Sequence, residues 1–146
     1  MINFFYKVSN FFIKDELNFI QCIKMILNNE GKEIGNINYI FCNDSYILKI
    51  NQKYLKKNYY TDVISFDSSN SSITNKKIIT HSFVSGDIFI SIDRVRDNAN
   101  KWHELFQREL YRVMIHAILH LIGYNDQKIT DKIYMNKKEE FYLILF

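Results

Sequence analysis

Two histidines, a glycine and an aspartate stand at a spacing that suits metal chemistry. The segment reads His116-Ala-Ile-Leu-His120-Leu-Ile-Gly123-Tyr-Asn-Asp126. Residues four apart on a helix share one face, so both imidazoles can reach one ion. Gly123 can adopt the left-handed conformation that ends a helix, and the turn would bring Asp126 back to the same point. The spacing predicts a metal site with three ligands: His116, His120 and Asp126.

The number of ligands indicates the type of metal site. Three protein ligands, with a fourth position left for water, are typical of a catalytic zinc, so we expect one Zn²⁺ per chain and expect the same three residues to be catalytic. The spacing is also that of the metzincin peptidases, but the Glu that follows their first His is Ala117 here. This difference argues against peptidase chemistry.

The predicted helix over residues 105–122 must position the two histidines. Apolar residues cover most of its circumference, which is typical of a buried helix. Its one polar stripe consists of Arg108, Glu109, Arg112, His116 and His120. We therefore expect this stripe to line a cleft. Glu109 is interpreted either as a group near the metal or substrate or as an ordinary surface carboxylate.

Composition favours a cytoplasmic protein with one domain over residues 1–146. The 146 residues are 47% hydrophobic, which suits one substantial core. There are two cysteines, no apolar run of about 18 residues and no pattern of a signal peptide, so we expect reduced thiols and no membrane partner. The net charge of +3 permits an anionic partner but is lower than in a dedicated nucleic-acid coat protein.

The remaining patterns predict strands and helices without regular alternation. Strands are expected at 2–8 (an edge strand), 34–42, 61–66 and 83–91, and helices at 15–27, 45–55, 92–98 and 130–145. In helix 45–55 the residues expected to face inward are Ile47, Leu48, Ile50 and Leu55. Residues 67–77, rich in Ser and Asn, are expected to form an exposed loop. The order favours an α+β layer packing over a doubly wound sheet.

Besides residues 116–126, four motifs stand in a fixed order along the chain: Ile50-Asn51-Gln-Lys-Tyr54-Leu55, Thr61-Asp62-Val63-Ile64-Ser65-Phe66, Ser85-Gly86-Asp87-Ile88 and Arg112-Val113-Met114-Ile115. In this order they resemble the motifs of the bacterial YbeY family, the rRNA maturation factors described as single-strand-specific, metal-dependent endoribonucleases. The resemblance implies a single domain with a small mixed β-sheet packed against several helices, and with the metal helix buried centrally. It also implies zinc on His116, His120 and Asp126.

The function that the resemblance implies is cleavage of single-stranded RNA. We expect a zinc-dependent endoribonuclease that acts in rRNA maturation, at the 16S rRNA 3′ end, and in ribosome quality control. Its expected partners are single-stranded RNA, the rRNA precursor and the small ribosomal subunit, and DNA is not expected as a partner. The metal would lower the pKa of a water and polarise a phosphoryl oxygen. Either that water or the RNA 2′-OH could attack.

The chain departs from the commonest family pattern at three informative positions. The glycine that usually follows the first His is Ala117 here, a small change that helix propensity favours. The third ligand is usually His and is Asp126 here, which lowers the charge of the site. The arginine that many members carry after the aromatic residue of the Asn-x-x-Tyr segment is Leu55. Another cation must then contact phosphate, and the candidates are Arg94, Arg96, Arg108, Arg112, Lys56 and Lys57.

Three interpretations stay open at this point. Asp62 and Asp87 are either acid–base groups or residues of turns and caps. A noncatalytic, metal-stabilised ribosome-assembly factor is the alternative that Leu55 favours. A zincin-like peptidase is the alternative that the ligand spacing favours and Ala117 disfavours.

Overall fold

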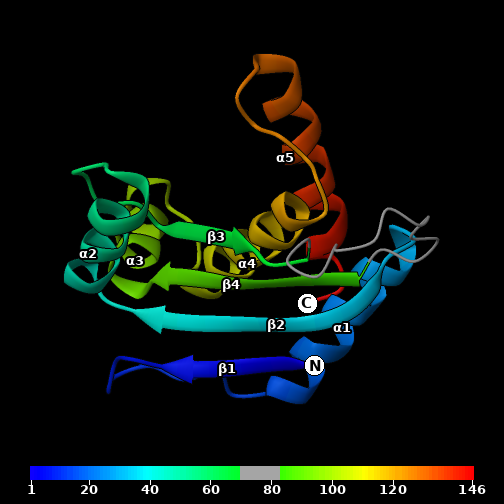
Figure 1. The fold of residues 1–146 in the computed structure, drawn as a ribbon, viewed down its shortest axis with the longest axis horizontal. Helices are drawn as coiled ribbons and strands as arrows, with labels where there is room; N and C mark the ends of the chain where they lie inside the picture. The colour runs from blue at the N-terminus through cyan, green and yellow to red at the C-terminus, as the bar shows by residue number, and fades with distance from the viewer. Residues whose placement is uncertain (70–82) are drawn as a thin grey trace, which may run out of the picture.

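The fold is built on a four-stranded mixed sheet (Figure 1). The structure, a computed structural model, describes residues 1–69 and 83–146. The strands are β1 (Ile2–Tyr6), β2 (Glu33–Cys42), β3 (Val63–Asp67) and β4 (Phe83–Ser91), in the spatial order β1-β2-β4-β3. The β1–β2 and β2–β4 pairs are parallel and the β3–β4 pair is antiparallel. The predicted α+β class and the edge position of the first strand are confirmed.

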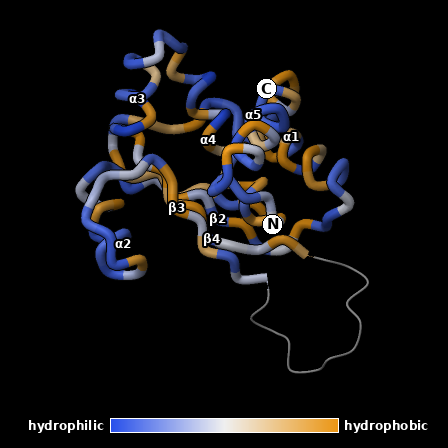
Figure 2. Tube along the Cα trace, turned by 90° about the horizontal axis from the view of Figure 1, so that it is seen from above, coloured by the Kyte–Doolittle hydropathy of each residue, from blue (hydrophilic) through white to orange (hydrophobic). Residues whose placement is uncertain are grey.

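Five helices accompany the sheet in the described part of the chain. They are α1 (Glu16–Asn29), α2 (Asp44–Leu55), α3 (Ile92–Lys101), α4 (Phe106–Leu121) and α5 (Ile129–Leu143). Helices α2 and α3 lie at one end of the sheet and α1 at the other (Figures 1 and 2). Asp15 and Asn43 cap α1 and α2 by accepting backbone N–H groups at 3.0 and 2.9 Å, as N-cap side chains do.

The alternation of side chains along the strands divides the apolar residues between two faces. On one face Tyr39, Phe41, Ile88 and Ile90 are fully buried, and they share one core with residues of α1, α4 and α5. On the other face a smaller cluster forms around Ile64, Phe89 and Ile47 of α2. Helix α4 supplies nine buried residues and belongs to the main core. Its predicted central burial is confirmed.

Gly86 allows α4 to lie close to the sheet. A Cβ atom at this position would stand 2.9 Å from Leu121 Cδ2 and 2.5 Å from the carbonyl oxygen of Phe66. Both contacts are shorter than real Cβ atoms show; the Leu121 side chain could turn away, but the backbone of β3 could not move without disturbing the sheet. Gly86 therefore leaves room for β3 and for the last turn of α4, which carries His120, to lie close to β4.

The prediction that Leu55 faces inward was wrong. Its side chain is 43% exposed, whereas Ile47 is fully buried. The reason is local. Leu55 is the last residue of α2, and Lys56, with its left-handed φ of 54°, turns the chain there, so Leu55 lies at the cleft and not in the core. In the predicted exposed loop 67–77, residues 70–77 lie outside the described residues.

Two further observations concern the cysteines and membrane spans. Cys22 and Cys42 are both buried and unpaired, as expected for reduced thiols. No helix in the described ranges has the length and apolar character needed to cross a membrane.

Candidate metal centre

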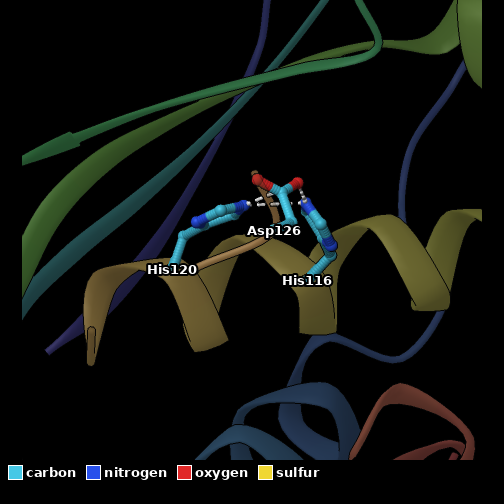
Figure 3. A group of neighbouring side chains, drawn as sticks. All are labelled: His116, His120 and Asp126. Carbon is cyan, nitrogen blue, oxygen red and sulfur yellow. Dashed lines mark hydrogen bonds and ion pairs between the residues drawn. The ribbon is translucent and has the colours of Figure 1, made fainter. Parts of the chain in front are cut away.

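A glycine-terminated turn returns the chain to α4. Gly123 has a φ of 108°, and its N–H donates to the His120 carbonyl at 3.0 Å. The Tyr124 N–H donates to the Leu119 carbonyl, also at 3.0 Å. These two bonds are those of the Schellman motif, in which a residue with positive φ follows the helix end. The predicted role of Gly123 is confirmed, and Asp126 lies beside the two histidines (Figure 3).

The turn is anchored to α1 and α5 through Glu30. The Tyr124 hydroxyl donates to one oxygen of Glu30 at 2.6 Å, and Lys138 Nζ donates to the other at 2.8 Å. Burial by itself raises the pKa of Glu30, but hydrogen bonds from Lys138, Tyr124 and Tyr142 lower it overall. Glu30 is therefore ionised at neutral pH, and this charged group holds the side chain of Tyr124, two residues before Asp126.

The three side chains converge on one point (Figure 3). His116 Nε2 and His120 Nε2 are 2.9 Å apart, and they lie 3.4 and 3.3 Å from Asp126 Oδ2. Ligands about 2.0–2.1 Å from a tetrahedral zinc stand about 3.3–3.4 Å from one another. Two of the three distances already have this value, and the third needs only a small opening. The residues present therefore fit one ion.

The second nitrogen of His116 faces a carboxylate from α5. His116 Nδ1 lies 3.4 Å from Glu139 Oε1, and Glu139 is only 5% exposed. Ligating histidines almost always pass their other N–H to such a group, which fixes the tautomer and the ring orientation. Burial lowers the pKa of His116, but Glu139, Asp126 and Asp62 raise it overall. Glu139 was missed in the sequence because it sits in the charged run Lys-Lys-Glu-Glu, which is typical of a solvated helix face.

The first half of the polar stripe on α4 turns toward α5 instead of lining the cleft, and in this half the prediction was wrong. Arg108 and Arg112 pair with Glu140 of α5 at 2.8 and 2.9 Å. Glu109 is not a surface carboxylate, because it is 2% exposed; it lies buried within electrostatic reach of Arg112, Asp62 and Glu139. Burial raises its pKa to about 7; Arg112 opposes the rise, and Asp62 adds to it.

An open cleft of about 590 Å³ begins at the candidate ligands. One wall is α4, the opposite wall is β3, and the chain between α2 and β3 closes one end. Its lining residues are Asn51, Leu55, Lys57, Tyr59, Thr61, Asp62, Val63, Ile64, Ser65, Asp67, His116, His120, Leu121, Asp126 and Gln127.

The structure separates the two aspartates that could act as acid–base groups. Asp62 lines the cleft with His116, and burial raises the pKa of its carboxyl while His116 and backbone N–H groups oppose the rise. Asp87 lies on β4 outside the cleft, where it accepts a hydrogen bond from Asn38 at 2.9 Å. Only Asp62 is brought to the site.

The fold and the His-His-Asp group define a protein with a candidate mononuclear metal site in the wall of an open cleft. This chain belongs to the YbeY family: the family model described as Endoribonuclease YbeY matches residues 7–145. The chain is 48% identical to an Endoribonuclease YbeY of Karelsulcia muelleri, over 98% of this chain and 94% of that one. It is 44% identical to the one of Flavobacterium psychrophilum, over 100% and 96% of the two chains. The resemblance seen in the motifs is confirmed.

A solved structure shows the same fold. The solution structure of a protein from Thermotoga maritima superposes with a TM-score of 0.65 at 23% identity, and covers 99% of this chain and 88% of that one. The arrangement of sheet and helices is therefore shared across a wide sequence distance.

Proposed function

We propose that this chain is a zinc-dependent, single-strand-specific endoribonuclease, formed as one catalytic domain by residues 1–146. The observation that carries the proposal is the convergence of three ligand atoms, at the spacing of a tetrahedral ion, in a cleft open to a polymer. Full-length relatives named endoribonucleases support the reaction type. We place its action in the cytoplasm, in rRNA maturation at the 16S rRNA 3′ end and in ribosome quality control, with the rRNA precursor and the small ribosomal subunit as partners.

His116, His120 and Asp126 would hold the zinc. A zinc held there would supply Lewis-acid chemistry, which would polarise a phosphoryl oxygen and lower the pKa of water. With two neutral imidazoles and one carboxylate, the site carries one positive charge fewer than a site with three histidines. Added cations in the cleft then matter more for attracting RNA, because phosphate contacts dominate its affinity.

Asp62 is the residue best placed to move a proton. It lines the same cleft as the ligands, and burial raises the pKa of its carboxyl. A carboxyl with a raised pKa holds its proton nearer to neutral pH, which suits a general acid that protonates a leaving oxygen. Asp62→Asn would then lower the cleavage rate while metal content stays unchanged.

The direct test is cleavage of a defined, unstructured RNA by the purified, zinc-loaded protein. We expect cutting that stops with chelator, spares casein, and weakens as salt rises. The matching DNA stays intact if the 2′-OH is the nucleophile, and mass analysis of the product ends identifies the attacking group. His120→Ala, purified identically, is the control for contaminating ribonuclease. If that variant cuts as fast as the parent, the chain is a metal-stabilised assembly factor and not the nuclease.

A further inference from the structure

A basic and aromatic loop forms one rim of the cleft. Residues 56–60, here called the Lys56–Tyr60 loop, connect the end of α2 to the approach of β3, and all five are exposed. Tyr59 and Tyr60 are 54% and 52% exposed, which is unusual for rings of this size. From Ser45 to Tyr60 the chain carries four lysines and no acidic residue, although its net charge is only +3. Of these lysines Lys57 lines the cleft, opposite in charge to the carboxylates of Asp62, Asp67 and Asp126 that also line it.

The loop is fastened by a buried amide. Asn51 is 1% exposed; its backbone carbonyl oxygen accepts the Lys57 N–H at 3.2 Å, and its side-chain Nδ2 donates to the Tyr59 carbonyl at 2.9 Å. Lys56 takes the left-handed conformation that this closure needs. The side chains of Lys57 and Tyr59 are therefore presented by a fixed backbone, which lowers the entropy lost when a ligand binds.

Lys57 and Tyr59 lie close together in the lining of the cleft. The Lys57 ammonium lies 5.9 Å from the centroid of the Tyr59 ring, and both residues line the cleft that holds the candidate ligands. An aromatic face offers stacking to a base, and an ammonium offers a charge to the neighbouring phosphate. The two side chains are thus close enough together to contact a base and its neighbouring phosphate.

We propose that Tyr59 and Lys57 form a nucleotide subsite, in which Tyr59 stacks on a base flanking the scissile phosphate and Lys57 contacts the RNA backbone. The inference rests on the proposed function and names how the substrate is held. Stacking on Tyr59 requires an unpaired base, since the bases of a duplex are already stacked on one another. The subsite therefore provides a physical reason for single-strand specificity, and Lys57 takes over phosphate contact where the chain has Leu55.

Equilibrium binding tests the subsite apart from catalysis. A labelled, unstructured RNA is titrated onto the full chain carrying His120→Ala, in chelator, so that no cutting interferes. Adding Tyr59→Ala should weaken binding about tenfold, and Tyr59→Phe should keep most of the affinity because the ring is retained. The matched control is Tyr134→Ala on α5, since Tyr134 is 52% exposed and has Lys138 5.9 Å from its ring. That change should leave binding unaltered.

The lysine is tested by the salt dependence of the same binding. Lys57→Gln should weaken binding and reduce the slope of log affinity against log salt by about 0.7, the value for one phosphate contact on a single strand. Lys24→Gln, an exposed lysine of α1, should change neither.

The outcomes separate this subsite from the proposed function. If the zinc-loaded parent cuts RNA while Tyr59→Ala binds and cuts as well as the parent, the subsite is wrong and the nuclease assignment stands. If Tyr59→Ala and Lys57→Gln weaken binding selectively but the parent never cuts, the subsite stands and the nuclease assignment fails. Equal losses in Tyr59→Ala and Tyr134→Ala would also overturn the subsite.

Discussion

The α4 wall of the cleft and the Lys56–Tyr60 loop at its rim are held in place by different means. On α4, His116 and His120 are held by tertiary structure: the helix packs on the sheet at Gly86, and Glu139 backs one ring from α5. The Lys56–Tyr60 loop is held by local hydrogen bonds to Asn51, and its side chains stay in solvent. The proposed metal site and the proposed nucleotide subsite therefore rest on separate supports, so mutations should affect them one at a time.

The largest effect is expected at the α4 wall. The double variant His116→Ala, His120→Ala should lose its divalent ion, because one remaining carboxylate rarely holds zinc tightly. Metal content per chain, measured by elemental analysis after gel filtration, checks this. RNA binding at the Lys56–Tyr60 loop should persist in the same protein. If the variant keeps one ion per chain, His116 and His120 are not the metal ligands.

The stability of the α4 wall should depend on pH through Glu109. Burial raises its folded-state pKa to about 7 from 4.5, so the folded protein holds this proton more tightly than the unfolded chain. The contribution of Glu109 to the free energy of unfolding is then fully present below about pH 4.5. It is lost as pH rises through 7, by on the order of 3 kcal/mol. Glu109→Gln should abolish this loss in urea unfolding at pH 5 and pH 8. Parallel pH curves for parent and variant would contradict the assignment.

A change in the turn tests the third ligand. Asp126→Ala should lower zinc affinity at least about tenfold, the scale that even supporting residues command. Asp126→His should largely restore it, because an imidazole can replace the carboxylate. Competition with a calibrated chelator gives both numbers. If neither change alters the zinc affinity, another residue is the third ligand.

A neighbouring pair of glutamates sharpens the contrast between buried and exposed support. Glu139→Ala should lower zinc affinity about tenfold, since His116 loses the carboxylate that orients it. Glu140→Ala is the matched control, because Glu140 is half exposed and pairs with Arg108 and Arg112 instead. Its metal affinity should equal that of the parent. Equal losses in the two variants would point to a general weakening of α5.

The smallest effect is expected at Leu55, next to the Lys56–Tyr60 loop. Leu55→Arg places a guanidinium at the cleft rim, where it can pair with phosphate through two parallel hydrogen bonds. RNA affinity and cleavage should rise about threefold, with a steeper salt dependence. Zinc affinity should not change. A shift in zinc affinity instead would show that the loop and the α4 wall are coupled.

The sequence predicts the parts of the site that depend on near neighbours. The helical face shared by His116 and His120 and the turn at Gly123 follow from residue spacing and backbone preference. Glu139 and the burial of Glu109 could not be predicted, because they depend on how α5 packs across α4. Leu55 misleads for the opposite reason: its apolar side chain fits the helical pattern, but α2 ends there.

Strand β3 also has a consequence for how copies of this protein behave at high concentration. It is an edge strand of the described sheet, and four of its five residues line the cleft. An open edge is also a template on which another copy could add a strand and begin to aggregate. The strand has only five residues, and Asp62 and Asp67 stand just before it and at its end. Short length and like charges are among the means by which natural sheets discourage such pairing, so β3 can line an open cleft without offering a good template to a second sheet.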